Sequence, residues 1–547
     1  MRTSVVVASV LAVCAGSGAA LVASGATGGA SSAVSNSSHR TPGDHSAGPA
    51  RWAELLSAST DTGPALTTPV YILVTLSSSH RPSTLESWAR QKGLRVLWYT
   101  GEQFCVLGGS ARDMGDALGV RIDNYVSRTG EHFYSSVHQP SVPGAVRSEV
   151  TGLGVVSNYG RQSPQATPAT YVPNGGLSQS GLLQAYQATP LSQLGDQGQG
   201  ETVVFIETGP FEQSDVNTFS QKFNLPAVQV TDVGGLAPGG ASASEEADMD
   251  IQVVHAIAPQ AHLVYFNLLG APGLTNNTDF GSAIALSIAA ATKQFPGAIY
   301  SISLGDCELD NGKADEDAIS SAASAAEAGG STLYASSGDT GGADCEQNGA
   351  DSLNSSEGVE IPAAAPDVTG VGGTAVSVTT SGDYLGETTW SWPMESQGSG
   401  GGVSTISARP SWQTGPGVGG QGVSNGREIP DVAADADPVT GTPFVSDGKV
   451  LAGNGTSLAT PIWAGMTALM DEFLHNNGQK PIGFANPTYY HLAADTALSP
   501  SPFHDVTIGG NVFYRAAAGY DPVTGLGSPD VAALAQDILD IDKGTAG

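Results

Sequence analysis

Alternating strand and helix patterns between residues 202 and 338 limit the fold of this chain more than any other feature. Five short runs rich in β-branched and aromatic residues are typical of strands, and four helical patterns separate them. In chain order these segments are 202–208, 213–223, 228–233, 244–258, 262–269, 281–295, 298–305, 315–328 and 331–338. Repeated βα units predict a mostly parallel, doubly wound α/β sheet with helices on both faces. In such sheets, functional residues gather where strands end and helices begin.

The N-terminal residues predict an exported chain. Residues 1–26 combine Arg2, an apolar run and then small residues, which is typical of a secretory signal peptide. A membrane anchor is the alternative, and the short, Gly- and Ser-diluted run disfavours it. Residues 27–66 are rich in Ser, Gly, Ala, Thr and Pro and are expected to form a flexible leader. No later run is apolar for long enough to span a bilayer, so we expect a secreted, extracellular product with no membrane partner.

Residues 67–147 predict a small α+β domain ahead of the main one. Four strand patterns and two helical patterns follow one another in the order βαββαβ, with the strands expected at 70–76, 94–100, 103–109 and 121–127. This order is typical of a ferredoxin-like unit. Residues 148–179 return to Gly, Pro, Ser, Gln and Thr and are predicted to be a linker to a second domain at 180–547.

The charge balance excludes some partners. Lys and Arg number 21 against 52 Asp and Glu, which gives a formal net charge of −31. Such a surface repels nucleic acid and anionic membranes. Below about pH 4 many of these carboxylates are neutral, so the composition suits an acidic environment.

The cysteines are few. Cys14 lies in the predicted signal peptide and Cys105 in the small domain, leaving Cys307 and Cys345 in the main domain. Export permits a Cys307–Cys345 disulfide, and two free thiols are the alternative.

Ser457 is either a nucleophile or only a helix cap. It lies in GNGTSLATPIWAG, residues 453–465, where glycines precede an apolar helical pattern. Thr456 and Ser457 are common capping residues, so capping is the default interpretation. A nucleophilic Ser requires a base within hydrogen-bond reach, most often His. No histidine after residue 180 lies in the His-Gly-Thr setting of subtilisins, which disfavours a His-dependent subtilase and leaves a carboxylate as the candidate base.

Two acidic segments supply candidate carboxylates. Glu246 and Asp250 are four residues apart, so a helix would place them on one face beside apolar residues. Taken alone, this segment favours a solvated acidic turn at a helix N-terminus. Asp339 follows the strand pattern 331–338 and precedes glycines, so a βα loop would direct it into a cleft, while an ordinary turn is the alternative.

Together these motifs resemble the sedolisin family of serine-carboxyl peptidases, including kumamolisin-like members. The matching residues are Glu246-x-x-x-Asp250, Ser336-Ser337-Gly338-Asp339 and Gly455-Thr456-Ser457 with Ala459-Thr460-Pro461, supported by SISLG at 301–305, VTGVGGTAV at 368–376, GGGVS at 400–404 and REIPDVAADADPVTG at 427–441. The resemblance extends from about residue 180 to the C-terminus, and the preceding small domain resembles the family's activation prodomain.

The resemblance implies a subtilisin-like fold and an acid-active peptidase. Ser457 would attack the peptide carbonyl, Glu246 would take its proton and Asp250 would orient Glu246. Asp339 would face the developing oxyanion and would have to be protonated to donate a hydrogen bond. Protein or peptide substrates, a self-processing precursor inhibited by its own prodomain, and a monomeric enzyme are expected.

The C-terminal segments HDVTIGGN and AAGYDPVTGLGSP resemble the family's calcium loop. Asp505 and Asp521 would supply carboxylates to one structural Ca²⁺, and Val506, Ala517 and Gly519 would supply backbone carbonyls. Without the resemblance, an ordinary Gly-rich surface loop is the preferred interpretation.

The sequence also departs from the family pattern. Leu304 occupies a position where many relatives have Trp, which puts part of the hydrogen-bond support in doubt, and Glu207 matches a supporting Glu of some relatives. An endopeptidase is favoured over a tripeptidyl-peptidase. A catalytically silent secreted binding protein of the same fold is the alternative from another class, and the four intact residues Glu246, Asp250, Asp339 and Ser457 argue against it.

Overall fold

The computed structural model describes residues 56–544 except 129, 131, 160–162, 165–175, 235–243, 272–273, 275–277, 346–356, 380–381, 393–396 and 422–424. The chain divides into two units, Met1–Asp44 and His45–Gly547, and every described residue belongs to the second. The predicted signal peptide, most of the leader and residues 160–162 and 165–175 of the linker therefore lie outside the described residues.

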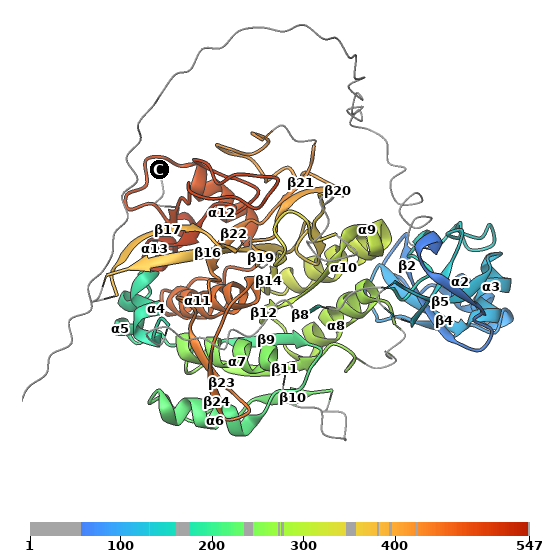
Figure 1. Ribbon diagram of the computed structural model, residues 1–547, viewed down its shortest axis with the longest axis horizontal. Coiled ribbons are helices and arrows are strands. Elements are labelled where there is room, and N and C mark those ends of the chain that lie inside the picture. Colours follow the sequence, from blue (N-terminus) through green and yellow to red (C-terminus); the bar gives the residue numbers. More distant parts are fainter. Residues whose placement is uncertain are drawn as a thin grey trace, which may run out of the picture. The chain divides into compact units, whose positions relative to one another are not determined.

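An eight-stranded sheet forms the centre of the main domain (Figure 1). Its order is β10-β11-β9-β12-β14-β16-β17, and β22 also pairs with β16. All described pairings are parallel except β16 with β17. The strands are β9 (Thr202–Glu207), β10 (Thr231–Val233), β11 (His262–Asn267), β12 (Ile299–Ile302), β14 (Thr332–Ser336), β16 (Thr369–Val378), β17 (Tyr384–Thr389) and β22 (Val432–Asp435). The predicted doubly wound, mostly parallel sheet is confirmed.

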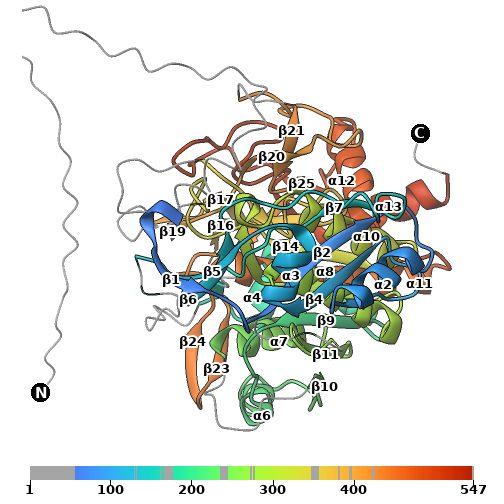
Figure 2. The same cartoon turned by 90° about the vertical axis from the view of Figure 1, so that its right-hand side faces the viewer.

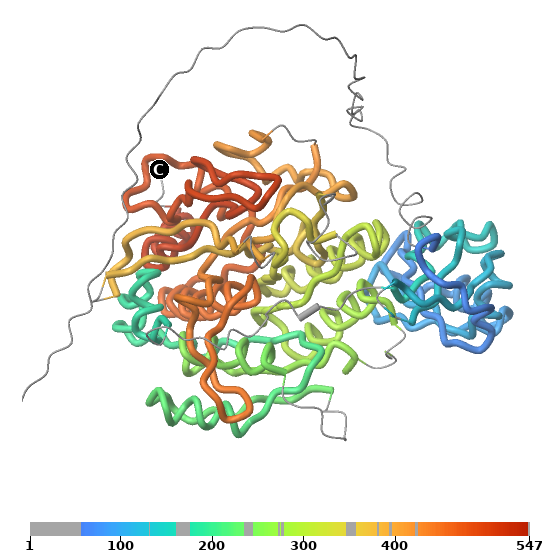
Figure 3. The backbone as a smooth tube through the Cα atoms, viewed as in Figure 1, coloured from blue at the N-terminus to red at the C-terminus, as the bar shows by residue number. Residues whose placement is uncertain are grey.

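Helices cover both faces of this sheet because its strands are buried on both sides. Val203 and Phe205 of β9 pack into the core of α7 (Glu245–Ile257) and α11 (Thr456–Asn476). The alternate residues Val204 and Ile206 pack into the core of α8 (Phe280–Gln294) and α10 (Lys313–Glu327). The tube in Figure 3 shows α11 in orange beside the green α7. These two helices carry the predicted nucleophile and acid pair.

Shorter elements complete the main domain. A hairpin of β23 and β24 contacts α6 and α7 (Figure 2). The remaining elements are α4 (Gln179–Ala185), α5 (Thr189–Leu194), α6 (Gln213–Lys222), β13 (Leu304–Cys307), α9 (Glu308–Asn311), β15 (Glu360–Ile361), β18 (Ser391–Trp392), β19 (Gln397–Gly398), β20 (Gly402–Ala408), β21 (Gly426–Ile429), β23 (Pro443–Ser446), β24 (Lys449–Ala452), α12 (Ala485–Ala494), β25 (Phe503–His504), β26 (Ser528–Pro529) and α13 (Val531–Asp542).

The N-terminal region has the predicted elements but differs in its pairing. The strand order β3-β4-β2-β7 is that of a ferredoxin-like sheet, with all described pairs antiparallel. The fourth strand of this sheet is β7 and not the predicted 121–127 segment, which forms β5 in a separate sheet of order β1-β5-β6. The elements are β1 (Thr60–Pro64), β2 (Pro69–Leu76), α2 (Ser83–Gln91), β3 (Arg95–Leu97), β4 (Phe104–Ser110), α3 (Ala111–Leu118), β5 (Ile122–Val126), β6 (His132–Ser136) and β7 (Val150–Leu153).

Two predicted boundaries change as a result. Strand β1 lies within residues 27–66, which we predicted to be a flexible leader, and β7 lies within the predicted linker 148–179. Both are short, Gly-containing strands that pair through the backbone with a neighbouring strand and have no periodic apolar pattern. Among the residues that the structure describes, no helix is both long and apolar enough to cross a bilayer.

Candidate active site

Ser457 lies in the first turn of α11 and does not cap it. The N-cap position is Gly455, and no side chain caps this helix end. The Ser457 side chain is fully buried, and its Oγ has no hydrogen-bond partner among the described residues. Ser457 therefore does not cap this helix, and the capping interpretation is wrong.

Asp339 faces this helix end from the loop after β14. Its Oδ1 accepts a hydrogen bond from the backbone N–H of Thr456 at 2.8 Å and another from the Thr456 hydroxyl at 2.7 Å. Burial raises the pKa of Asp339 to about 7, although the two hydrogen bonds from Thr456 oppose the shift. A proton on Asp339 is therefore held in mildly acidic solution, where an ordinary aspartate is ionised.

Gly455 allows Asp339 to come this close. Its φ is +82°, and a Cβ at this position would lie 2.4 Å from Asp339 Oδ2. Any other residue would be strained in the backbone and would also displace the carboxyl. The glycine before Thr456-Ser457 is therefore needed for the contact between the Asp339 loop and α11.

Glu246 and Asp250 are buried on α7 and do not form a solvated turn. Their exposed fractions are 3% and 0%. The helix is buried on all sides between the sheet and α11, so the local interpretation as a solvated N-terminal turn is wrong. Burial of two carboxyls four residues apart is unfavourable unless protons or donors are shared between them.

Glu207, at the end of β9, joins this acid pair. Burial and the charges of Asp250 and Glu246 raise the pKa of Glu207 well above its usual range, and burial also raises the pKa of Asp250. If all the carboxyls were ionised, neither Glu207 oxygen nor Asp250 Oδ1 would have a donor. If Glu207 is protonated, its hydroxyl donates a hydrogen bond to Asp250, and Asp250 is the acceptor.

Ser303 is part of the site and was not assigned a role from the sequence. Its hydroxyl donates to Asp250 Oδ2 at 2.6 Å and lies 3.3 Å from the carbonyl oxygen of Ser457. It links α7 to α11 across residues far apart in the chain. The only signal in the sequence was its place inside the SISLG motif.

The strand after Ser303 is β13, and β8 (Ser163–Pro164) pairs with it. Strand β13 pairs with β15 on one side and with β8 on the other, both antiparallel. Leu304 of β13 is fully buried in the core beside α8 and α10, so it is not part of the acid network. The predicted linker thus adds one short strand to the edge of β13, beginning at the residue after Ser303.

The Cys307–Cys345 disulfide is formed, and Cys105 is a buried free thiol. Cys307 ends β13, and Cys345 follows Asp344 in the loop that begins at Asp339. Asp344 Oδ1 accepts hydrogen bonds from the N–H of Thr340 at 2.9 Å and its hydroxyl at 2.6 Å. The disulfide and this carboxylate hold the Asp339 loop near β13.

The residues predicted to bind calcium lie in one loop cluster. Asp505 Oδ2 accepts from the N–H of Gly519 at 2.9 Å, and Asp521 Oδ2 accepts from the N–H of Ala517 at 2.9 Å. Among the described residues, no backbone N–H donates to the carbonyls of Val506, Ala517 or Gly519. Two carboxylates and three such carbonyls form a hard-oxygen donor set that fits Ca²⁺.

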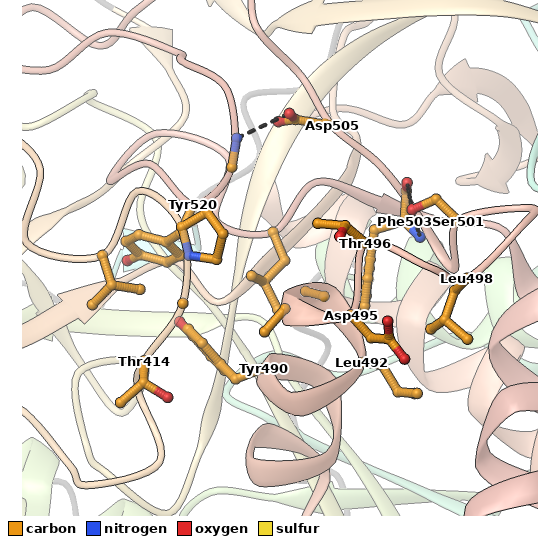
Figure 4. A pocket seen from close by; sticks show the side chains of 17 residues that line it. Thr414, Tyr490, Leu492, Asp495, Thr496, Leu498, Ser501, Phe503, Asp505 and Tyr520 are labelled. Atoms are coloured by element: carbon orange, nitrogen blue, oxygen red, sulfur yellow. Dashed lines mark hydrogen bonds between the residues drawn. The ribbon is translucent and has the colours of Figure 1, made fainter. Parts of the chain in front are cut away.

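A cavity adjoins this loop cluster (Figure 4). Its volume is about 290 Å³, and Asp505 and Gly519 contribute to its wall together with the C-terminal end of α12. It lies away from the residues around Ser457, so it is not part of the acid network described above.

Comparison with known proteins agrees with this geometry. The family model Peptidase_S8, described as "Subtilase family", matches residues 231–511. Kumamolisin from Bacillus sp. (strain MN-32) is 32% identical over 469 residues, which cover 79% of this chain and 78% of kumamolisin. The chain belongs to the sedolisin family.

One further relative and one solved structure are also similar to this sedolisin-family member. Tripeptidyl-peptidase 1 of Bos taurus is 26% identical over 550 residues, covering 89% of both chains. The solved structure of Pseudomonas sedolisin, a serine-carboxyl proteinase, matches with a TM-score of 0.56 and 27% identity, covering 68% of this chain and 99% of that one. The protein is therefore a serine peptidase that acts on proteins or peptides.

Proposed function

We propose that this sedolisin-family protein is a secreted, acid-active endopeptidase made as a self-processing precursor. Ser457 attacks the peptide carbonyl, and Glu246 accepts its proton and passes it to the amine that leaves when the peptide bond breaks. Asp250 orients Glu246, and protonated Asp339 donates to the oxyanion. The acyl-enzyme on Ser457 is then hydrolysed by water. The pairing of β8 with β13 carries the proposal, because it supplies a polypeptide at the edge where a substrate strand would pair.

The same pairing favours an endopeptidase. Residues of the N-terminal region precede β8 in the chain, so an edge that accepts β8 also accepts a polypeptide that continues beyond it towards the N-terminus. A tripeptidyl-peptidase requires a free N-terminus three residues before the scissile bond. The likeness to Tripeptidyl-peptidase 1 of Bos taurus keeps that activity as the second candidate.

The raised pKa of Asp339 supports activity in acid. Asp339 can donate to an oxyanion only when protonated, and burial raises its pKa to about 7. Above that range its charge would repel the developing oxyanion. Activity should therefore appear on acidification, and it should fall again when the acid pair is fully protonated.

Contacts with the catalytic domain support an inhibitory role for residues 67–147. Leu73, Phe104 and Val106 of the N-terminal region belong to the same apolar cluster as α8 and α10. A precursor held in this way keeps β8 at the β13 edge until the chain is cut. We propose that this region is the prodomain, that the protein acts as a monomer, and that Ca²⁺ occupies the Asp505–Asp521 loop cluster.

Acidification of the precursor tests the proposal. The purified chain is moved from pH 7 to about pH 4, near the ordinary carboxyl range, and its mass and N-terminal sequence are followed. We expect a new N-terminus between residues 148 and 179 in the wild type and none in Ser457→Ala, Glu246→Ala or Asp339→Ala.

Internally quenched peptides with blocked and free N-termini distinguish the two peptidase candidates. Cleavage of blocked peptides supports the endopeptidase, and release of tripeptides from free N-termini alone supports the second candidate. A precursor that stays intact in acid and cleaves neither peptide would instead support a silent binding protein.

A further inference from the structure

Ser303 connects the acid pair to the nucleophile helix. It lies between β12 and β13, and its side chain is fully buried. A hydroxyl carries one proton, and the 2.6 Å contact with Asp250 Oδ2 is much shorter than the 3.3 Å contact with the Ser457 carbonyl oxygen. The hydroxyl proton is therefore assigned to the contact with Asp250, because the shorter O···O distance is the stronger hydrogen bond.

This hydrogen bond fixes the orientation of the Asp250 carboxyl. With Oδ2 held by Ser303, Oδ1 is the oxygen available to the other two carboxyls, Glu207 from β9 and Glu246 from the preceding turn of α7. Among the described residues, Ser303 is the only hydroxyl side chain that donates to Asp250. Leu304, the next residue, lies in the apolar core and offers no donor.

We propose that Ser303 is a positioning residue. It keeps the Asp250 carboxyl oriented as the acceptor for Glu246 and at a fixed position relative to the backbone of Ser457. The inference rests on the proposed peptidase function. After Glu246 takes the proton from Ser457, it must donate to an oxygen already aligned to receive it. Without the Ser303 hydroxyl, Asp250 Oδ2 loses its donor, and the carboxyl rotates or takes up a proton itself.

Steady-state kinetics of Ser303→Ala test this role. The full chain is activated in acid until mass spectrometry shows complete conversion, and kcat and KM are measured with a blocked peptide from pH 3 to pH 7. We expect kcat to fall roughly 10- to 100-fold, as for a misplaced catalytic group, with KM changed less than about twofold. Unchanged kcat in Ser303→Ala would overturn the inference.

Ser301→Ala is the matched control. Ser301 lies two residues earlier, on β12, and is also fully buried, but its hydroxyl has no hydrogen-bond partner among the described residues. Like Ser303→Ala, the Ser301→Ala variant loses one buried hydroxyl oxygen from this part of the sheet, but that hydroxyl makes no hydrogen bond to Asp250. A fall in kcat equal to that of Ser303→Ala would show a general packing effect and would contradict the inference.

A double-mutant cycle with Asp250→Asn shows whether Ser303 acts through Asp250. If it does, Ser303→Ala lowers kcat less than about twofold when Asp250 is already Asn. Additive losses would contradict the inference. If the alanine variant does not fold, Ser303→Cys, which has nearly the same shape but is a weak donor, replaces it in the cycle.

The wild type and Ser457→Ala are assayed in parallel. A wild type with no Ser457-dependent hydrolysis would refute the proposed function itself. An active wild type with a fully active Ser303→Ala would refute only the role of Ser303.

Discussion

The carboxyl of Asp339 accepts two hydrogen bonds from Thr456, the residue before Ser457, and both reach the same oxygen, Oδ1. The other oxygen, Oδ2, lies against Gly455. The proton that Asp339 needs for its proposed role is therefore expected on Oδ2, because Oδ1 is already an acceptor. This arrangement ties the position of the acid directly to the first turn of α11.

Thr456→Val should extend activity to higher pH. The Thr456 hydroxyl stabilises ionised Asp339 and so lowers its pKa. Without that hydroxyl, the pKa of Asp339 should rise above about 7, and the protonated form should persist to higher pH. The pH dependence of kcat/KM should show its upper limb displaced by up to about one pH unit, because the backbone N–H still donates. A limb that moves to lower pH would contradict the assignment of Asp339.

Gly455→Ala should abolish processing and destabilise the fold. The new Cβ would lie 2.4 Å from Asp339 Oδ2, and the residue would keep a φ of +82°. Gly448→Ala is the matched control, because Gly448 has a φ of +71° and a Cβ added there would meet nothing within 4 Å. Both variants should lose about 1–3 kcal/mol from backbone strain. Only Gly455→Ala should lose activity by more than about 100-fold, the cost of misplacing a catalytic group; equal activities would show that the contact is unimportant.

The fold should lose stability as the pH rises through neutrality. Asp248 on α7 is buried, and burial raises its pKa from 3.8 to about 7 despite hydrogen bonds from Ser446 and the Glu212 N–H. The folded state therefore binds more protons than the unfolded chain between about pH 4 and pH 7. Stability is full below that window and falls by roughly 4 kcal/mol per such group across it.

Melting temperatures at constant calcium between pH 4 and pH 8 measure this loss. Asp248→Asn cannot ionise and should flatten the dependence on pH. Asp317→Asn, which removes an exposed carboxylate that pairs with Lys313, is the control for the loss of one negative charge at the surface. A wild-type melting temperature that rises from pH 5 to pH 8 would contradict the assignment.

Calcium should raise the melting temperature of the mature enzyme. Binding to the folded state alone adds RT ln(1 + [L]/Kd), which is about 2.7 kcal/mol at a hundredfold excess over Kd. Asp521→Ala should remove most of this gain, since its carboxylate is buried in the loop cluster. Identical melting curves with calcium and with chelator would exclude this site, independently of any activity measurement.

Reduction of the Cys307–Cys345 bond should weaken both stability and substrate binding. The bond joins residues 38 apart in sequence and should contribute about 2–4 kcal/mol. It also connects β13 to the Asp339 loop, so its loss should raise KM. A Cys307→Ser/Cys345→Ser variant should behave like the reduced wild type and should not respond to reductant. A response in that variant would point to another thiol effect.

The positions of the strands and helices could be predicted from the sequence better than the pairing of the strands. Strand β9 and its neighbours were recognisable because buried parallel strands are continuous apolar runs, and the spacing of Glu246 and Asp250 placed both on α7. The pairing of β7 was missed because its four residues, Val150–Leu153, are held by the edge of β2 and have no periodic pattern.

The role of Ser303 could not be predicted from the sequence for a similar reason, because its contacts are with residues far away in the chain. It meets Asp250 and Ser457 across 53 and 154 residues of sequence, and nothing local distinguishes it from Ser301. The burial of Glu246 was likewise set by α11, which packs on α7 from about two hundred residues away, so the local pattern of an acidic helix start was misleading.

If substrates pair with the β13 edge as proposed, the strand formed by Ser163 and Pro164 makes the precursor its own competitor. A segment tethered in the same chain is present at an effective concentration of about millimolar order, whatever the concentration of the protein. Other polypeptides must exceed that value to reach the β13 edge, so dilution does not activate an uncut chain. Once the tether is cut, the same segment is a free ligand at the concentration of the enzyme itself, and dilution then favours its release.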